Sequence, residues 1–371
     1  MLVGKPQLLK NLNSDIVRDL IYREGPISKP EIAEQTALSL PTVKKRVDLL
    51  LREGWIRETG RSGEGVGRKA IMYEADRSHN MILLLYDRDG FIASLVDITG
   101  MIHHKERYVY AESGARGYME FLCACIEKLM KKVSGTVLSI GVTVPGVVRS
   151  SGMIKHIPEI PEWEKYNLQE ELQKRYGVDV LVENDIRMMT LGYYESRIRG
   201  QYSDMVYIFA DGALSAGIII NGRLHRGLEN FAGELGFLIF HENLSSKNQP
   251  VDGRGDFETS VMEVLGQIEK DKENKELLER YYDLLVKGIV SVGCVTAPEI
   301  VVIQGNHLDD TVLEYITERI RPYFPKDVLP ELRINTEYGC DAQGLIQECV
   351  RHSIEKSAKL GRITIGGKTD S

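Results

Sequence analysis

The residues between 39 and 48 combine hydroxyl, cationic and apolar side chains at a spacing that suits nucleic-acid binding. Val43, Val47 and Leu50 would share one face of a helix and pack into a core. The positions left facing outward could reach base edges and phosphates in a DNA major groove. These candidate DNA-binding positions are Ser39, Pro41, Thr42, Lys44, Lys45 and Arg46. The alternative is the solvated face of an ordinary helical bundle, because a lysine-bearing face alone does not specify DNA.

The segments around this helix favour the DNA-binding interpretation. Ser28 and Glu31 have the spacing of a capping box at the start of a preceding helix. A strand near Ile56 and another over residues 68–73 enclose a Gly- and Arg-rich segment, which predicts a β-hairpin. The order of helices followed by a hairpin is that of a winged helix-turn-helix, expected over residues 1–75. The wing residues placed to meet phosphates or a minor groove are Arg61, Arg68 and Lys69.

Charge is divided unevenly along the chain. Residues 1–75 hold 13 Lys and Arg against 10 Asp and Glu, a balance of +3. The 371-residue chain as a whole carries −7, so the remaining residues carry −10. A basic module attached to an acidic body fits a partner such as operator DNA for the module alone, and it argues against a general nucleic-acid surface on the body.

Length and composition set the expected class and compartment. A chain of 371 residues allows two or three domains with substantial cores. The longest apolar run, Met81 to Tyr86, is too short to span a membrane, and the N-terminus has no apolar signal core. Five cysteines fit a reducing compartment, so we expect a cytoplasmic protein with no membrane partner. Cys123 and Cys125 lie in an apolar helical pattern and are expected in a core, not at a metal.

From about residue 80 the pattern becomes strands alternating with helices, which predicts an α/β body. Two strand–turn–strand units, 81–98 and 205–220, open two similar halves and suggest two lobes. Asn221-Gly222 predicts a tight hairpin turn. Further strands are expected at 101–110, 137–144, 180–182 and 300–304, and helices at 117–133, 167–176, 185–199, 275–292 and 341–357. Residues 242–256 read as one long polar loop.

Several motifs in this body resemble those of the ROK family, named for repressors, open reading frames and kinases. Gly141-Val142-Thr143-Val144-Pro145-Gly146 is similar to its G-x-x-x-P-G strand end, and Glu183-Asn184-Asp185 to its E-N-D. Asn221 to Gly227 followed by Ala232-Gly233-Glu234-Leu235-Gly236 is similar to N-G-x-x-x-x-G and A-G-E-x-G. The resemblance covers nearly the whole chain. It implies a two-lobed actin/hexokinase-like (ribonuclease-H-like) domain over 76–371, with lobe one at about 76–195 plus the helix at 341–357, and lobe two at about 196–340.

The resemblance also implies a sugar site between the lobes. By this likeness Asn184 and Asp185 would hold ring hydroxyls, and Glu234 and Glu258 would hold others. In the family's kinases the residue at Asp185 would be the general base that activates the sugar hydroxyl. The alternatives are an N-cap role for Asp185 and a turn carboxylate role for Glu234.

The family's nucleotide-binding motifs are altered in this chain. By the resemblance, the metal-organising D-x-G-x-T positions fall on Leu85, Asp87 and Asp89. The second phosphate turn reads Asp211-Gly212-Ala213, and the adenosine-side Gly-Gly pair reads Gln304-Gly305. Leucine cannot organise Mg²⁺, and the added carboxylates repel phosphate. We therefore expect no ATP binding, no cofactor and no enzymatic activity.

The family's zinc motif is altered as well. Its His position is Phe237 here, and its three Cys positions fall on Gln249, Val251 and Asp256. One carboxylate without its partners makes no tetrahedral site, so no metal is expected. His103, His104 and the other histidines have no partner at ligand spacing and are expected on the surface or in the core.

Together these features predict a DNA-binding transcriptional regulator, expected to be a repressor, whose kinase-like domain senses a sugar or sugar derivative without phosphorylating it. A homodimer or higher homo-oligomer is expected, because one recognition helix reads only a few base pairs. Two alternatives stay open at this point. One is a regulator with a vestigial cleft controlled by a protein partner, and the other is an ATP-dependent sugar kinase with a DNA-binding domain.

Overall fold

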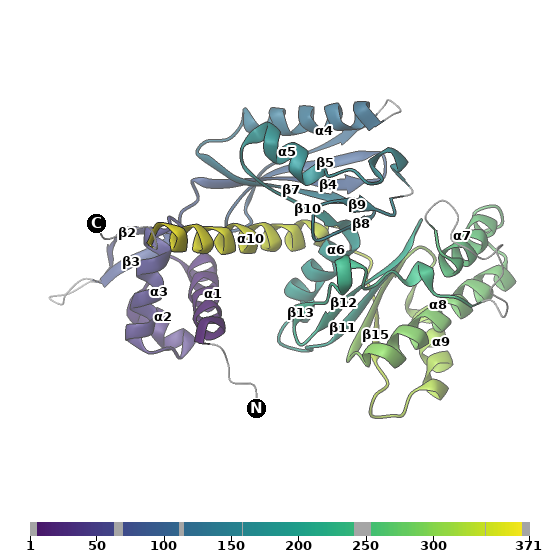
Figure 1. Cartoon of the computed structure of the whole chain (residues 1–371). Helices are drawn as coiled ribbons and strands as arrows, with labels where there is room; N and C mark the ends of the chain where they lie inside the picture. The colour runs from purple at the N-terminus through teal and green to yellow at the C-terminus, as the bar shows by residue number, and fades with distance from the viewer. Residues whose placement is uncertain are drawn as a thin grey trace.

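A computed structural model of the chain describes residues 6–62, 70–110, 115–157, 159–240, 254–337 and 339–365. The N-terminal part forms a small three-helix domain with a β-ribbon (Figure 1). Its elements are α1 (Pro6–Glu24), β1 (Ile27–Ser28), α2 (Lys29–Thr36), α3 (Leu40–Arg52), β2 (Ile56–Ser62) and β3 (Ala70–Ala75). The strands pair in the order β1-β3-β2. Val43, Val47 and Leu50 of α3 are buried in the core of this domain, as their spacing predicts.

The second part begins with a five-stranded sheet, ordered β10-β7-β4-β5-β6, that forms lobe one. Its strands are β4 (His79–Asp87), β5 (Gly90–Asp97), β6 (Ile102–Val109), β7 (Thr136–Val144) and β10 (Asp179–Asn184). Helices α4 (Ala115–Met130) and α5 (Leu168–Tyr176) cover one face (Figure 1), and Cys123 and Cys125 lie in that core. The connection from β7 to α5 contains β8 (Val147–Val148), β9 (Ile154–Lys155) and a short 3₁₀ turn, η1 (Pro161–Trp163). Because β7 and β10 are parallel neighbours, this connection starts at the end of the sheet where β10 also ends.

Lobe two repeats this plan with the sheet order β13-β12-β11-β14-β15. Its strands are β11 (Met205–Ala210), β12 (Leu214–Ile220), β13 (Arg223–Leu224), β14 (Ile300–Gly305) and β15 (Glu331–Ile334). Its helices are α7 (Asp256–Ile268), α8 (Lys275–Thr296) and α9 (Asp310–Ile320), with 3₁₀ turns η3 (Leu228–Asn230), η4 (Leu235–Phe237) and η6 (Arg321–Tyr323). The three helices contribute to the core on one face of the sheet.

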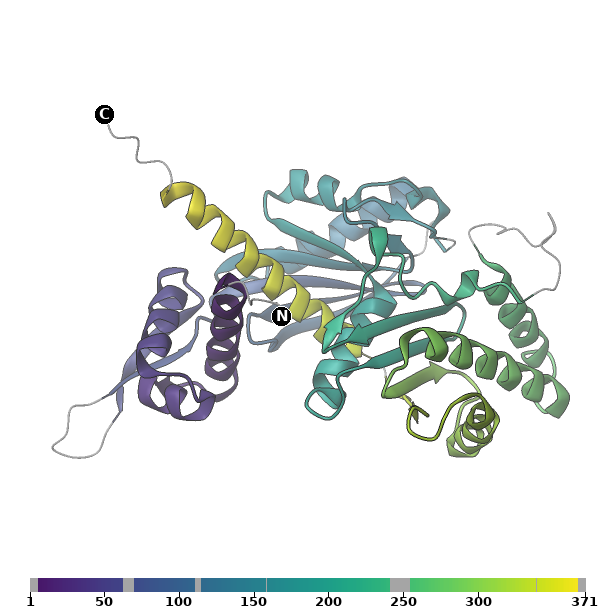
Figure 2. The ribbon, with the colours of Figure 1, turned by 60° about the horizontal axis from the view of Figure 1, so that its bottom comes forward.

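Two helices connect the lobes. Helix α6 (Asp185–Tyr193) continues into a π-helical turn, η2 (Tyr194–Ile198), and crosses α10 (Cys340–Ile365) between the sheets (Figures 1 and 2). The crossing is so close that a Cβ on Gly192 would lie 1.7 Å from the Cys340 carbonyl oxygen. A Cβ on Gly344 would lie 2.0 Å from the Met188 carbonyl oxygen. Only glycine permits this approach of the two backbones.

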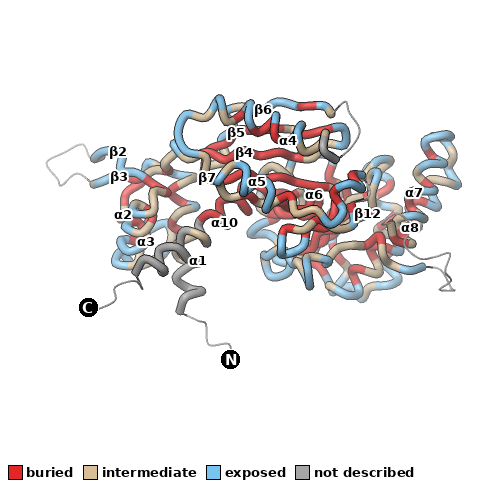
Figure 3. The backbone as a smooth tube through the Cα atoms, turned by 45° about the horizontal axis from the view of Figure 1, so that its top comes forward, coloured by how far each residue is buried: buried red, intermediate tan, exposed pale blue. Residues whose placement is uncertain are grey.

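The N-terminal domain is attached to lobe one by packing as well as by the chain. Ile98, at the end of β5, is buried in the core of the winged helix. The His79 imidazole Nε2 lies 2.8 Å from the Gly54 carbonyl oxygen. Figure 3 shows buried backbone running through both sheets and their connecting helices. Lobe one and the winged helix are therefore physically coupled.

The expected elements are present, most with ends shifted by a few residues, whereas helix α7 and the strands β8, β9 and β15 were not predicted. Helix α7 begins at Asp256, directly where the long polar loop was predicted to end, and sequence analysis did not identify it. Residues 241–253 of that loop lie outside the described residues. The domain limits at 75 and 195 stay predictions.

Candidate functional site

Helix α3 presents the predicted outward row with one exception. Ser39, Pro41, Lys44 and Lys45 are exposed and Thr42 is half-buried. The hydroxyls of Ser39 and Thr42 lie 2.8 Å apart and hydrogen-bond to each other at the start of the helix. These five residues form a continuous surface, which we call the α3 face.

Arg46 does not belong to the α3 face. Its guanidinium turns toward α1 and donates a hydrogen bond of 3.2 Å to the Ser14 hydroxyl. Asp48, the acidic residue on the outer side of α3, forms an ion pair of 2.8 Å with Lys29 of α2. That pairing offsets a negative charge beside the α3 face.

The wing is described only in part. Strands β2 and β3 pair antiparallel with a bulge between Glu58 and Gly60. Arg61 belongs to β2, but its side chain lies outside the described part of the chain, as do Arg68 and Lys69 entirely. The predicted role of these three cations stays a prediction.

The four predicted sugar-binding residues meet in one pocket between the lobes. Asn184 and Asp185 come from the junction of β10 and α6, Glu234 precedes η4, and Glu258 lies in the first turn of α7. All four line the same cavity, together with Pro145 and Gly146 at the end of β7 and other side chains. The lining is completed by His156, Glu159, Ile186, Phe209, Ala213, Leu214, Ser215 and Phe237.

The N-cap role that was the alternative for Asp185 belongs to Asn184 instead. The N-cap of α6 is Asn184, whose Oδ1 accepts a hydrogen bond of 2.9 Å from the Arg187 backbone N–H. Its Nδ2 donates to the Gly146 carbonyl, 3.1 Å away, and so fixes the turn after β7. Asp185 is therefore free of the capping role. Its carboxylate accepts from the Ile186 N–H at 2.8 Å and faces the cavity.

Burial shifts the acid–base properties of this pocket. Removal from water raises the pKa of Asp185 to about 7, assisted by the nearby carboxylates of Asp341 and Glu159. Burial also raises the pKa of Glu234 to about 7, against the opposing effect of the Arg187 guanidinium. The pKa of Glu258 is raised by burial as well. Carboxyl groups tuned to neutral pH can accept hydrogen bonds from sugar hydroxyls or transfer a proton.

Two pocket residues were missed by sequence analysis. His156 is exposed, in keeping with the expectation of a surface or core position, and it also lines the cavity, a place that was not predicted. Glu159 lines it too and lies 3.7 Å from Arg254 of lobe two. Both residues follow β9 in the connection from β7 to α5. The parallel pairing of β7 and β10 was the available signal, because it brings that connection to the edge where Asn184 lies.

Three aromatic rings adjoin the carboxylates. The ring centroid of His156 lies 5.4 Å from that of Phe237 and 6.0 Å from that of Phe231. Phe231 and Phe237 lie 5.5 Å apart. We call these three residues the aromatic wall. Since His156 belongs to lobe one and both phenylalanines to lobe two, the wall crosses the cleft.

The acidic residues at the positions that the resemblance assigns to the phosphate turns are paired within the protein. Asp87 and Asp89 contact Arg107, the latter at 3.4 Å. Asp211 forms an ion pair of 2.6 Å with Arg88 and accepts a hydrogen bond of 2.7 Å from the Asn306 amide. Leu85 is buried at the end of β4 and offers no oxygen ligand. The tips of the two opening hairpins thus contact each other directly.

Further hydrogen bonds join the two lobes. The Asn230 amide donates to the Val148 carbonyl at 2.7 Å, and the Ser150 hydroxyl donates to the Glu229 carboxylate at 3.1 Å. Arg226 of lobe two donates to Glu183 at 2.6 Å and to Glu348 of α10 at 2.8 Å. The residue before Asn184 is therefore linked through one guanidinium to the connecting helix α10.

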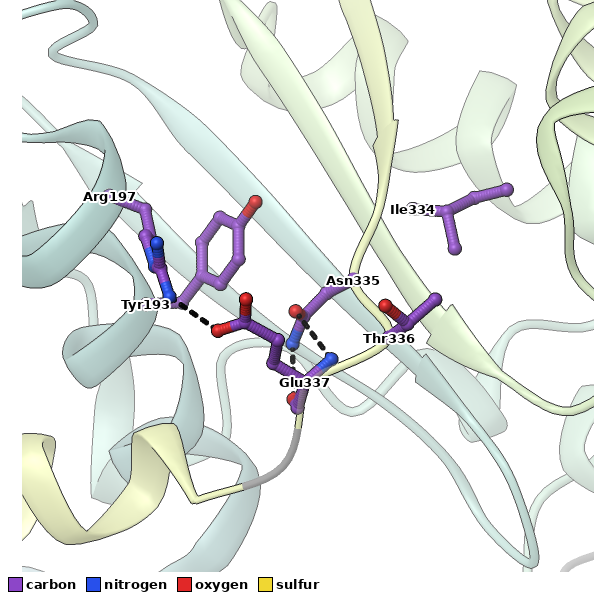
Figure 4. A pocket seen from close by; sticks show the side chains of 6 residues that line it. All are labelled: Tyr193, Arg197, Ile334, Asn335, Thr336 and Glu337. Carbon is purple, nitrogen blue, oxygen red and sulfur yellow. Dashed lines mark hydrogen bonds and ion pairs between the residues drawn. The ribbon is translucent and has the colours of Figure 1, made fainter.

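A second cavity, of about 170 Å³, lies at the hinge between η2 and the segment that leads into α10 (Figure 4). Arg197 and Glu337 form an ion pair beside it. Asn335 donates to the Tyr207 hydroxyl at 2.8 Å and to the Gln304 side chain at 3.2 Å. Gln304, at the predicted adenosine-side position, is thus 1 % exposed and engaged in a core network. These bonds hold the segment that leads into α10 against η2 and the sheet of lobe two.

The described residues at the altered zinc positions make other contacts. Phe237 packs in the aromatic wall, and Asp256 accepts a hydrogen bond of 3.0 Å from the Phe240 N–H at the start of α7. Gln249 and Val251 lie outside the described residues. Within the described ranges, no group of three or more His, Cys, Asp or Glu side chains could hold a metal ion. The same ranges contain no helix long and apolar enough to cross a membrane.

Comparisons with known proteins agree with this geometry. Residues 19–57 match a winged helix-turn-helix DNA-binding family, and residues 88–258 match the ROK family. The chain therefore carries an N-terminal winged helix-turn-helix followed by a ROK family domain with the actin/hexokinase-like fold. The predicted fold class is confirmed.

The chain is similar to the xylose repressor of Caldicellulosiruptor bescii, with 29 % identity over 63 % of this chain and 60 % of that protein. It is equally similar to the dual regulator NagC of Escherichia coli K12, with 29 % identity over 64 % of this chain and 59 % of that protein. These matches span about three-fifths of each relative.

Among solved structures, a ROK family transcriptional regulator described as a homologue of the E. coli Mlc protein covers 95 % of this chain and 99 % of its own, with a TM-score of 0.75 and 20 % identity. The ROK hexokinase of Thermus thermophilus covers 75 % of this chain and 99 % of its own, with a TM-score of 0.59 and 18 % identity. At these identities the two structures establish the fold alone.

Proposed function

We propose that this protein is a cytoplasmic DNA-binding transcriptional regulator, acting as a repressor, whose two-lobed domain binds a sugar or sugar derivative without phosphorylating it. One observation carries the proposal. The sugar side of the cleft has a pocket lined by Asn184, Asp185, Glu234 and Glu258, whereas on the phosphate side Arg88 and Asp211 pair with each other. The name of the matched xylose repressor supports the sugar class.

The DNA-binding part of the proposal rests on the α3 face. Its hydroxyls and lysines stand on the exposed side of a helix whose other side is buried. Thr42 would contact base edges, whereas Lys44 and Lys45 would contact phosphates. A homodimer would place two such faces on twofold-related half-sites.

Signal transmission would use contacts between the lobes. A sugar held by Asp185 of lobe one and by Glu234 and Glu258 of lobe two favours one relative position of the lobes. Arg226 links lobe two both to Glu183 and to α10. Because the winged helix packs on lobe one through Ile98, a change in lobe position alters the spacing of two winged helices in a dimer.

The experiment uses the full chain. Duplexes are selected from a random pool at a fixed, stated salt concentration, and binding is then measured with d-xylose, d-glucose or N-acetyl-d-glucosamine added. The proposal expects a sequence-specific complex whose affinity changes with at least one sugar, and no thermal stabilisation by ATP-Mg. Absence of any duplex binding at low salt overturns the DNA-binding assignment. Specific DNA binding that no sugar alters favours control by a protein partner, and stabilisation by ATP-Mg favours a kinase.

A further inference from the structure

The pocket between the lobes has a chemically mixed lining. Asn184 and Asp185 contribute an amide and a carboxylate, further carboxylates come from Glu234 and Glu258, and His156 and Phe237 of the aromatic wall contribute ring surfaces. The centroid of Phe231, the third ring of the wall, lies 6.0 Å from that of His156 and 5.5 Å from that of Phe237. A ligand in this cavity therefore meets both hydrogen-bonding groups and ring surfaces.

The aromatic wall exists only when the lobes are together. His156 belongs to the loop after β9 in lobe one and has a positive φ of 49°, an uncommon conformation that its surroundings must hold. Phe231 and Phe237 flank the Ala232-Gly233-Glu234 segment of lobe two. A ligand that contacts both His156 and Phe237 thus bridges the cleft.

The polar and the aromatic lining residues select different parts of a ligand. Sugar hydroxyls can donate hydrogen bonds to the carboxylates and interact with the Asn184 side. A hydroxyl facing the phenyl ring of Phe237 would lose its hydrogen bonds to water without replacement, which is unfavourable. Carbon placed there is instead removed from water against an aromatic surface, which is favourable.

Charge restricts the ligand further. Four carboxylates line the cavity, from Glu159, Asp185, Glu234 and Glu258, and neither Lys nor Arg is among the described lining residues. The nearest guanidinium described beside Glu159 is that of Arg254, 3.7 Å from its carboxylate. A phosphate or carboxylate on the ligand would meet repulsion here.

We propose that the effector is an uncharged, unphosphorylated sugar that places apolar carbon against the aromatic wall, with Phe237 as the specificity-determining residue. That carbon is either the C–H face of the ring or the methyl group of an N-acetyl substituent. This inference rests on the proposed function.

The test compares three variants of the full chain with the unaltered protein by calorimetric titration of four probes. The probes are d-xylose, d-glucose, N-acetyl-d-glucosamine and d-glucose 6-phosphate. Phe237→Ala removes the wall, and Phe237→Tyr retains a ring. Phe240→Ala is the matched control, because Phe240 lies three residues on in the same segment but packs on Phe257 with a centroid distance of 4.6 Å.

We expect Phe237→Ala to weaken binding of the preferred uncharged sugar about tenfold or more, with less loss in Phe237→Tyr and a change of under about twofold in Phe240→Ala. If the N-acetyl methyl lies on the wall, the loss is greater for N-acetyl-d-glucosamine than for d-glucose. If the ring face lies there, the losses are equal. The ratio of the affinities for two sugars does not depend on the folded fraction of the sample, because both sugars bind the same folded molecules. Reduced stability of a variant therefore does not change this ratio.

Two outcomes overturn the inference alone. These are unchanged sugar affinity in Phe237→Ala while the unaltered protein binds sugar, and tighter binding of d-glucose 6-phosphate than of d-glucose. Failure of the unaltered protein to bind any of the probes overturns the sugar-sensing function and this inference together.

Discussion

Arg88 and Asp211 form an ion pair of 2.6 Å across the cleft, joining the tip of the β4–β5 hairpin to the tip of the β11–β12 hairpin. The two hairpins open the two similar lobes. The Asp211 side chain is only 9 % exposed, whereas that of Arg88 is 65 % exposed. A negative charge at the predicted phosphate turn is therefore compensated within the protein, and the two hairpins contact each other directly.

Replacing Arg88 with Ala should loosen the contact between the lobes. The loss of unfolding free energy should be small, about 0–1 kcal/mol, because the arginine is largely exposed to solvent. The population of separated lobes should rise, increasing the radius of gyration measured by small-angle X-ray scattering and weakening sugar binding. Arg107→Ala is the control, since Arg107 pairs with Asp87 and Asp89 inside lobe one. Equal radii for both variants would show that the Arg88 pair does not hold the lobes together.

The pH dependence of stability should reveal the buried carboxyl groups. Burial raises the pKa of Asp185 from 3.8 to about 7, so the folded state favours the protonated form. That contribution is complete below pH 3.8 and is lost as the pH rises through about 7. Asp185→Asn should therefore be more stable than the unaltered protein at pH 8, and this gain should be absent at pH 4. The expected gain in unfolding free energy is about 1–3 kcal/mol, reduced because part of the Asp185 carboxyl group contacts water.

Urea unfolding at the two pH values measures this difference. Glu162→Gln is the control, because Glu162 is an exposed carboxylate on η1, in the same connection as the cavity-lining Glu159. An equal gain at both pH values in Asp185→Asn would mean that relief of a buried charge is not the cause.

The elements of this fold follow from local patterns in the sequence, and their pairing across long distances does not. The apolar spacing of Val43, Val47 and Leu50 sets the buried face of α3 directly. Helix α7 was not predicted because it starts at Asp256, directly after a long polar segment. Its apolar face packs into the core of lobe two, a contact that local sequence patterns do not indicate. The hydrogen bond from Arg46 to Ser14 could not be predicted either, because it depends on how α1 packs against α3.

The residues predicted to bind sugar could be picked out and line one pocket because their motifs are short and contiguous, and their binding role stays a prediction. Glu183-Asn184-Asp185 marks one side of the pocket and Glu234 the other. His156 and Glu159 belong to no such motif, and their place depends on the path of the loop after β9. Arg88 and Asp211 lie 123 positions apart in the sequence, so their ion pair could not be predicted from local patterns. From the sequence, the Asp211 charge indicated only repulsion of phosphate.

The crossing of α6 and α10 should not tolerate a side chain at Gly344. A Cβ there would lie 2.0 Å from the Met188 carbonyl oxygen, so Gly344→Ala should lower the unfolding free energy by about 1–3 kcal/mol. Gly266→Ala is the matched control, because that helical position in α7 has nothing within 4 Å of a new Cβ. The control should gain up to about 1 kcal/mol from the better helix propensity of alanine. Similar unfolding midpoints for the two variants would contradict the close crossing.

Two kinds of change on the α3 face should affect DNA binding differently. Lys44→Ala combined with Lys45→Ala should weaken binding to all duplexes and flatten its salt dependence, because fewer counterions are released from phosphates. Thr42→Ala should instead alter the preferred sequence. Titrations at several salt concentrations measure the slope, with Lys270→Ala and Lys272→Ala on exposed positions of lobe two as the control. An unchanged slope in the α3 double variant would exclude phosphate contacts by these lysines.

Phosphoryl transfer from ATP to a hexose or amino sugar should be undetectable, although Asp185 has the position and the raised pKa of a general base. Such transfer depends chiefly on positioning and on neutralising charge around the phosphates, and a base alone contributes about 10²–10⁴-fold. Here Leu85 offers no metal ligand, and Arg88 is already paired with Asp211. Radiolabelled ATP with d-glucose or N-acetyl-d-glucosamine provides the measurement, and Asp185→Asn is the control for contaminating kinases. Sugar phosphate formed by the unaltered protein and abolished by that substitution would establish a kinase in place of the sensor.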